Sequence, residues 1–198
     1  MIETRERILE VSSELFARQG YAGTGMSQIV TQAEAALGSL YHFFPGGKEE
    51  LGKEAILRSG ALYGELVIAA FAGARGAVDA VDDFFRGAGR HLVQTDYADA
   101  CPIATVALEV ASTNDTLRQA TAEVFESWVA KTAEMLQDRG IARSKARRVA
   151  MLLFCLLEGA FILCRATRST TPLDIARLHA VGAVADELRA AVTGRTSS

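Results

Sequence analysis

The 198-residue chain contains only three prolines and three cysteines, and it has no excess of basic residues. The three prolines lie far apart, at Pro45, Pro102 and Pro172, so long stretches are free of residues that break helices. The net charge is −3, which excludes a uniformly basic coat for nucleic acid. A local surface that reads DNA is still compatible with that charge.

The cysteines are odd in number and none are spaced as C-x-x-C, which argues against a disulfide framework or a zinc site. We therefore expect no metal, no cofactor and a cytoplasmic, nucleoid-associated protein with reduced, buried cysteines. No signal peptide is visible, because the first seven residues run directly into a charged helix start. The most apolar run, residues 149–164, contains Glu158 and is shorter than the ~20 apolar residues of a membrane span. We interpret this run as a buried core or interface helix and expect no membrane association.

The 34 alanines and the spacing of the apolar residues predict an all-α fold of about nine helices. The predicted helices cover residues 4–19, 25–33, 37–43, 48–71, 77–95, 103–111, 115–137, 144–166 and 173–192. Thr4 and Thr24 are the expected N-caps of the first two helices. We predict three parts: a helix-turn-helix domain at residues 1–47, a helical effector-binding and dimerisation domain at 48–193, and a frayed tail at 194–198.

The most informative segment is residues 20–51, in which two short helices are joined by a tight turn after a longer packing helix. Leu40 and Phe44 are assigned to its small core. The residues that carry a family pattern are Gly20, Tyr21, Thr24, Ile29, Ala33, Gly38, Ser39, Leu40, Tyr41, His42, Phe44 and Lys48 to Leu51. On these residues the segment resembles the DNA-binding segment of the TetR family of bacterial repressors. The Phe44-Pro45-Gly46-Gly47-Lys48 stretch is similar to the LmrA/YxaF branch of that family.

The resemblance implies a set of DNA contacts at Thr24, Ser27, Gln28, Leu37, Gly38, Ser39, Tyr41, His42 and Lys48. Gly38 leaves room for a close approach to the groove, and Ser39 can bond a base edge. Tyr41 and His42 can bond phosphate oxygens without reading sequence, and Lys48 adds a phosphate charge.

Leu37 offers an apolar contact to a thymine methyl group, and Thr24 lies at a helix N-terminus that favours phosphate. For three of the positions a structural role is also open. Tyr41 could pack inside, His42 could be an ordinary surface residue, and Thr24 could serve only as a cap.

The chain departs from the family pattern in the turn before its predicted recognition helix. Glu34 stands where the family has a turn glycine, Ala36 replaces the usual cap residue, and Leu37 replaces a polar residue. Residues 1–52 also contain four basic and seven acidic residues. We therefore expect a shallow salt dependence of DNA binding.

The aromatic residues of the C-terminal part can either fill a core or line an apolar cavity for a small effector. The resemblance favours a cavity, since relatives release DNA when a ligand binds there. The candidate lining residues are Phe84, Phe85, His91, Cys101, Glu109, Phe125, Trp128, Phe154 and Glu158. Glu109 and Glu158 are acids within apolar runs, so each must be paired, contact ligand or point to solvent.

Two apolar stripes at helical spacing predict the surface of a homodimer. The stripe residues are Leu152, Leu156, Gly159, Leu163, Ile175, Leu178, Val181 and Ala185. Together these features predict a repressor that leaves a palindromic DNA operator when a small, apolar molecule binds. The alternatives are a ligand-binding dimer with weak or lost DNA binding, and a transcriptional activator. No catalytic motif or metal spacing is present among the three histidines, so we do not expect an enzyme.

Overall fold

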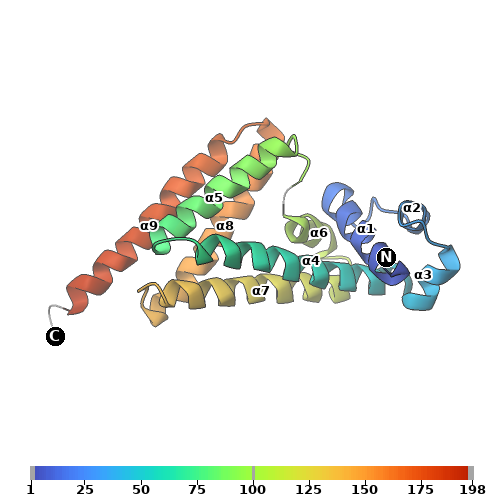
Figure 1. Ribbon diagram of the computed structural model, residues 1–198, viewed down its shortest axis with the longest axis horizontal. Helices are drawn as coiled ribbons and strands as arrows, with labels where there is room; N and C mark the ends of the chain where they lie inside the picture. Colours follow the sequence, from blue (N-terminus) through green and yellow to red (C-terminus); the bar gives the residue numbers. More distant parts are fainter. Residues whose placement is uncertain (1–2, 100, 196–198) are drawn as a thin grey trace. The chain divides into compact units, whose positions relative to one another are not determined.

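The computed structural model describes residues 3–99 and 101–195, and within these ranges all regular structure is helical. The helices are α1 (Thr4–Gln19), α2 (Met26–Gln32), α3 (Leu37–Phe43), α4 (Gly47–Ala72), α5 (Ala77–Gln94), α6 (Pro102–Val110), α7 (Asp115–Gln137), α8 (Arg143–Thr167) and α9 (Thr171–Arg195), as drawn in Figure 1. The prediction of an all-α fold with about nine helices is confirmed for the described residues.

Two sequence predictions about helix N-caps are wrong. The N-caps of α1 and α2 are Glu3 and Gly25, and neither makes a side-chain capping bond. Thr24 turns inward instead, and its hydroxyl donates to the Gly20 carbonyl at 2.7 Å. Residues 194 and 195 of the predicted tail belong to α9, and residues 196–198 lie outside the described residues.

Contacts along the chain divide it into two compact units. Unit 1 comprises Met1–Tyr63 and Asp99–Phe125, and unit 2 comprises Gly64–Ala98 and Glu126–Ser198. The three N-terminal helices thus share a unit with α6 and with the first parts of α4 and α7. Packing places no boundary at residue 47, and the functional division predicted there remains a prediction.

The core of unit 1 forms where the apolar faces of short helices meet α1 and α4. Its fully buried side chains include Ile8, Ile29, Leu40, Phe44 and Leu51. The assignment of Leu40 and Phe44 to the core is confirmed. Burying such side chains contributes about 1.5–3 kcal/mol each, so this small core holds helices that could not form alone.

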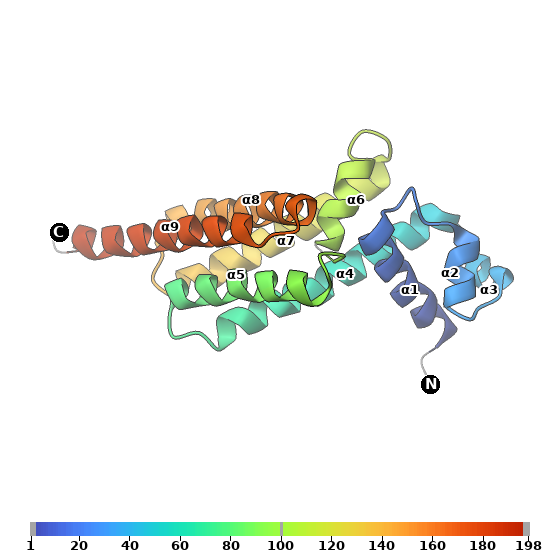
Figure 2. The same cartoon turned by 90° about the horizontal axis from the view of Figure 1, so that it is seen from above.

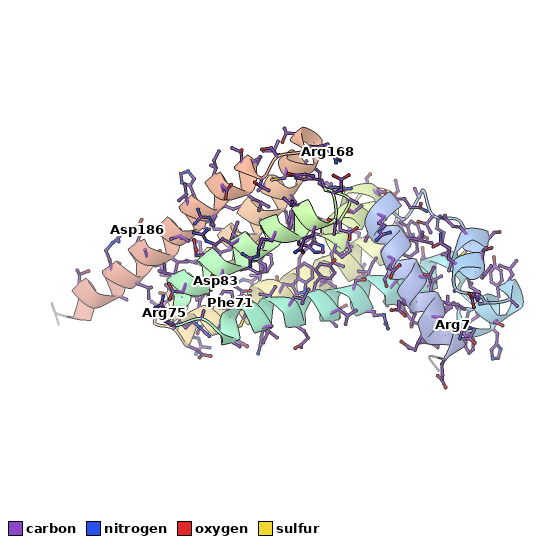
Figure 3. All side chains as sticks on the ribbon, turned by 45° about the horizontal axis from the view of Figure 1, so that its top comes forward. Arg7, Phe71, Arg75, Asp83, Arg168 and Asp186 are labelled. Atoms are coloured by element: carbon purple, nitrogen blue, oxygen red, sulfur yellow. The ribbon has the colours of Figure 1, made fainter. Side chains whose placement is uncertain are left out.

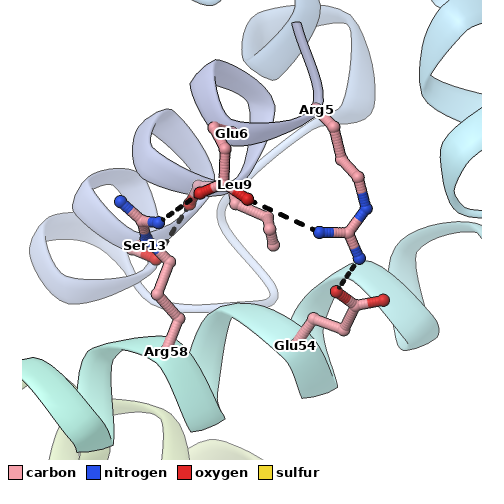
Figure 4. Close-up of polar contacts among 6 residues, drawn as sticks. All are labelled: Arg5, Glu6, Leu9, Ser13, Glu54 and Arg58. Atoms are coloured by element: carbon pink, nitrogen blue, oxygen red, sulfur yellow. Dashed lines mark hydrogen bonds and ion pairs between the residues drawn. The ribbon is translucent and has the colours of Figure 1, made fainter. Parts of the chain in front are cut away.

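Ion pairs join the polar edge of α1 to α4, as Figure 4 shows. Arg5 pairs with Glu54, and Arg58 of α4 pairs with Glu6 of α1 at 2.7 Å. The Arg5 guanidinium also lies over the Phe44 ring, 5.2 Å from its centroid. These contacts tie the first turn of α1 to α4.

In unit 2, α5 and α8 both pack against α9, and the three helices run side by side in Figures 1 and 2. Asp82 of α5 pairs with Arg177 of α9 and with Arg86 at 2.6 Å. The hydrogen bond from Arg86, with a further one from Arg177, lowers the pKa of Asp82 below its ordinary value. Trp128 and Phe154 stack with ring centroids 5.9 Å apart, which joins α7 to α8.

Within the described residues, α4 and α8 are each long and apolar enough to cross a membrane by length and composition alone. The α8 helix includes the apolar run at residues 149–164, which was expected to form a core or interface helix. Leu153, Phe154 and Leu157 are buried in the structure, whereas Met151, Leu152 and Leu163 are exposed. One face of α8 therefore serves the core, and the opposite face is apolar surface.

Candidate functional site

The turn between α2 and α3 closes with two hydrogen bonds that define a Schellman motif. The Glu34 amide donates to the Thr31 carbonyl at 3.3 Å, and the Ala35 amide donates to the Val30 carbonyl at 2.9 Å. Glu34 has a φ of 49°, the left-handed conformation that glycine adopts most easily. Glu34, which replaces the family's turn glycine, therefore lies in a backbone conformation that is unfavourable for a residue with a side chain.

Helix α3 begins at Leu37, as the sequence predicts, although it has no capping side chain. Its N-cap is Ala36, whose φ and ψ of −80° and 145° are those of a capping residue. Because the alanine side chain has no oxygen, the first amides of α3 have no side-chain acceptor at that position. The position of α3 therefore depends on the turn before it and on the core behind it.

Most of the predicted DNA contacts lie on an accessible face of α2 and α3. Ser27, Leu37, Gly38, Tyr41 and His42 are exposed. Gln28, Ser39 and Lys48 are half-buried.

Tyr41 is 50% exposed, so it does not pack inside. A Cβ built on Gly38 would meet no atom within 4 Å, so no packing inside the protein requires a glycine there. This is the expected property of a glycine that serves an approach from outside. Thr24 is only 1% exposed, and its amide already donates to the Tyr21 carbonyl at 3.3 Å, so it presents little to a ligand.

Lys48 lies at the start of α4 with its ammonium 4.4 Å from the centre of the Tyr21 ring. Burial lowers the pKa of Lys48, and the nearby Glu109 carboxylate opposes that effect. Burial also raises the pKa of Tyr21, with a further contribution from Glu49. A cation over an aromatic face is held in place, so Lys48 presents a positioned charge rather than a freely moving one.

The interpretation of Glu109 as a ligand-orienting acid is corrected by its position. Its Oε2 accepts a hydrogen bond from the Ala22 amide at 2.9 Å, in the turn between α1 and α2. Its Oε1 lies 1.7 Å from the point that a Cβ of Gly20 would occupy. Glu109 therefore holds the N-terminal helices to α6. Its position within an apolar run left pairing, ligand contact and solvent open, and only the fold decides among them.

The remaining candidates for an effector site fall in both units. Cys101 and Phe125 belong to unit 1, where the Cys101 sulfur accepts from the Ala104 amide at 3.4 Å and so caps α6. His91 is exposed on α5 rather than enclosed. In unit 2 the structure brings Trp128 and Phe154 together, the consecutive residues Phe84 and Phe85 lie edge to face, and Glu158 is half-buried.

An apolar groove of about 590 Å³ lies between α8 and α9 in unit 2. Four residues of the predicted dimer stripes line it: Leu156, Gly159, Leu163 and Ile175. Leu152 and Leu178 are also exposed, at 41% and 62%. The two stripes are thus left largely uncovered within one chain.

Two clusters in unit 1 lie outside the sequence predictions. A cleft of about 280 Å³ is lined by α1, α4 and the segment before α6, including Arg18, Arg58, Tyr63 and Asp99. Arg7 of α1 bonds the turn between α2 and α3, 26 residues further along the chain. Neither has a local sequence signature, because each depends on elements that only the fold brings together.

Comparison with known proteins identifies the class of protein. Residues 8–55 match the model of bacterial regulatory proteins of the tetR family. Residues 77–179 match the model of the C-terminal domain of LmrA/YxaF-like transcriptional regulators. The chain belongs to the TetR family of bacterial transcriptional regulators, which are DNA-binding proteins and not enzymes.

Individual relatives narrow the resemblance to the LmrA/YxaF-like branch. The HTH-type transcriptional regulator YxaF of Bacillus subtilis is 35% identical over 171 residues, covering 86% of this chain and 90% of that protein. LmrA of the same organism is 28% identical over 187 residues, covering 94% and 97%. Reduced Escherichia coli NemR has a similar fold, with a TM-score of 0.79 at 24% identity over 89% of this chain and 94% of that chain. The family resemblance drawn from residues 20–51 is confirmed.

Proposed function

We propose that this regulator is a homodimeric repressor that binds a palindromic operator and leaves it when a small, apolar effector binds. The exposed face of α3 is the observation that carries the proposal. Leu37, Gly38 and Tyr41 project from a helix whose opposite side is fixed in the core by Leu40. A short, rigid helix with one free face is the element that a helix-turn-helix protein places in a major groove.

The chemistry of each side chain on this face assigns it either to base contacts or to phosphate contacts. Ser39 and Leu37 would read base edges, whereas Tyr41, His42 and Lys48 would bond phosphates. The backbone amides at the start of α2 would add a phosphate contact beside Ser27. The scarcity of basic residues means that few counterions are released, so binding should depend only weakly on salt.

Dimerisation through α8 and α9 would supply the second recognition helix. The exposed apolar stripes and the groove between these helices support this part of the proposal. A two-fold interface pairs the same patch from both copies, which suits a continuous apolar face. Two heads would then meet successive major grooves ~34 Å apart.

Release would follow if the effector binds the non-binding arrangement of the dimer more tightly than the DNA-bound one. An effector site in unit 2 would be lined by apolar groups such as Trp128 and Phe154, which stack on one another, and Phe84 and Phe85. We propose that the effector displaces α4 and thereby changes the spacing of the two heads. A cytoplasmic, nucleoid-associated location follows from the proposed DNA target.

The test is fluorescence anisotropy with the DNA upstream of the regulator's own gene, from low to moderate salt. Wild type should bind selectively, and Tyr41→Ala should weaken binding to all sequences by about tenfold. Ser39→Ala is the matched variant on the same helix, and it should mainly relax base preference. Equal loss of base preference in both variants would contradict the assigned roles.

Absence of binding at low salt would lead to selection from a genomic library. If that selection also returned nothing, the chain would be a ligand-binding dimer that has lost DNA binding. The acidic residues of the N-terminal segment are the observation that keeps this second candidate in view. Binding at an operator that increases transcription would make the protein an activator.

A further inference from the structure

The turn before the recognition helix requires a conformation that its sequence does not favour. Glu34 occupies the C′ position of the Schellman motif with a φ of 49°. The left-handed conformation is unfavourable for residues other than glycine, because their Cβ crowds the following carbonyl oxygen. A contact from outside the turn that favours this conformation would offset the penalty, and the turn also leads into a helix whose N-cap, Ala36, makes no capping bond.

Arg7 of α1 provides that support from across the fold. Its Nε donates to the Ala33 carbonyl at 3.1 Å, and its Nη2 approaches the Glu34 carbonyl at 3.5 Å. These are carbonyls at the C-terminal end of α2, where a cation also interacts favourably with the helix dipole. The planar guanidinium can donate to both carbonyls at once, which an ammonium group does less well.

The Arg7 side chain is itself held in place by its own helix. Arg7 lies in the first turns of α1, and the next residue, Ile8, is fully buried. Figure 3 labels Arg7 on this part of α1. A second bond from Nη2 reaches the Thr4 hydroxyl at 3.4 Å. The guanidinium is thus held between its own helix and the turn.

We propose that Arg7 is a positioning residue for DNA recognition, which keeps Glu34 in the left-handed conformation and so fixes where α3 begins. This inference rests on the proposed DNA-binding function, because the position of α3 matters only if α3 reads DNA. It assigns Arg7 no direct contact with DNA. Arg7 stands in for the turn glycine that this chain lacks.

A direct phosphate contact is the competing role for an arginine in such a domain, and salt dependence separates the two. Loss of a phosphate contact makes the negative slope of log K against log salt shallower by about one. Loss of a positioning residue lowers affinity at every salt concentration and leaves the slope unchanged. The slope therefore reports on the role of Arg7 independently of how far affinity falls.

The experiment compares Arg7→Ala in two backgrounds, Glu34→Gln and Glu34→Gly. Both backgrounds remove the same charge, but only glycine removes the penalty on the left-handed turn. Operator affinity is measured by anisotropy across salt. In the Glu34→Gln background Arg7→Ala should lower affinity about tenfold, and in the Glu34→Gly background about twofold. Arg18→Ala removes the same charge from α1 without touching the turn, and it should leave affinity within about twofold of wild type.

Hydrogen exchange gives a readout that needs no DNA. The Ala35 amide, bonded to the Val30 carbonyl, should exchange faster in Arg7→Ala and regain protection when Glu34→Gly is added. Arg7→Lys keeps the charge and most of the stem, so it covers the case in which Arg7→Ala does not fold. It should give an intermediate loss of protection.

The outcomes separate the two proposals. If wild type binds no DNA, the proposed function fails, and exchange at Ala35 still decides whether Arg7 holds the turn. If wild type binds and Arg7→Ala binds equally well, the inference is wrong. A salt slope that becomes shallower by about one in Arg7→Ala, or an affinity loss of the same size in both Glu34 backgrounds, would also overturn it.

Discussion

The α2–α3 segment and the α8–α9 pair meet the demands of folding in opposite ways. Helices α2 and α3 have seven residues each, whereas α8 and α9 have 25 each. An isolated helix shorter than ~12 residues is marginal in water, so α2 and α3 depend on neighbours. Long helices bury enough apolar surface to hold one another, and α8 and α9 still have an apolar face to spare.

Besides their small apolar core, the short helices are supported by polar groups at single positions. Arg7 bonds the end of α2, Glu109 bonds the turn before α2, and Arg5 ties α1 to Glu54 of α4. The α8–α9 pair instead relies on repeated apolar residues, no one of which is decisive. The comparison therefore predicts that the recognition segment fails at single polar or glycine positions, and the α8–α9 face fails when its apolar character is broken.

The largest effect is expected from a charge placed in the α8–α9 groove. Ile175→Glu puts a carboxylate at a groove residue that is 54% exposed, so the single chain should fold normally. In the proposed dimer that carboxylate would be buried without a partner, which is strongly unfavourable. We expect a monomer in sedimentation analysis and an operator affinity more than about 100-fold weaker, because one head alone spans only a half-site.

Leu108→Glu is the matched control for that substitution. Leu108 is 71% exposed on α6 and does not line the groove. It should leave the protein dimeric, with wild-type operator affinity. If Ile175→Glu were still dimeric, the dimer interface would lie outside the α8–α9 groove. The claim that the α8–α9 face depends on its apolar character would then be wrong.

The next effect in size concerns the turn between α1 and α2. Gly20 has φ and ψ of 79° and 170°, a combination that is essentially restricted to glycine. A Cβ there would also meet the Glu109 carboxylate. Gly20→Ala should therefore lower the free energy of unfolding by about 3 kcal/mol, measured by urea denaturation.

A double-mutant cycle with Glu109→Ala separates the two causes. Removing the carboxylate relieves the steric contact but not the backbone strain, so Gly20→Ala should cost about 1 kcal/mol less in that background. Equal penalties in both backgrounds would show that Glu109 does not press on this turn. The α2–α3 segment would then depend less on contacts from outside than its contrast with the α8–α9 pair implies.

Sequence alone predicted the helices, because their positions follow from apolar residues that recur at helical spacing. The helix at Asp115–Gln137 and the recognition helix at Leu37–Phe43 have the predicted bounds. The exposed apolar residues of α8 and α9 also follow from their spacing. What each stripe packs against in a dimer stays a prediction.

Sequence could not predict which hydrogen-bond partner satisfies a particular polar side chain. Thr24 was expected to cap α2, but the structure has Gly25 at that position and turns Thr24 toward Gly20. For Glu109 the sequence left pairing, ligand contact and solvent open, and its carboxylate accepts from the Ala22 amide, 87 residues earlier in the chain. A residue's type limits its chemistry, but the tertiary fold selects which partner satisfies it.

The smallest predicted effect is a gain, and it tests whether the recognition segment is limited by its missing local signals. Ala36 already has the extended backbone of an N-cap, so Ala36→Ser needs no rearrangement to offer its oxygen to the first amides of α3. We expect the free energy of unfolding to rise by about 0.5–1 kcal/mol, measured by urea denaturation. Ala35→Ser, one residue earlier, is the control and should give no such gain. If Ala36→Ser were neutral, the outside contacts of Arg7 and the core would already hold α3 fully, and local capping would add nothing to a helix this short.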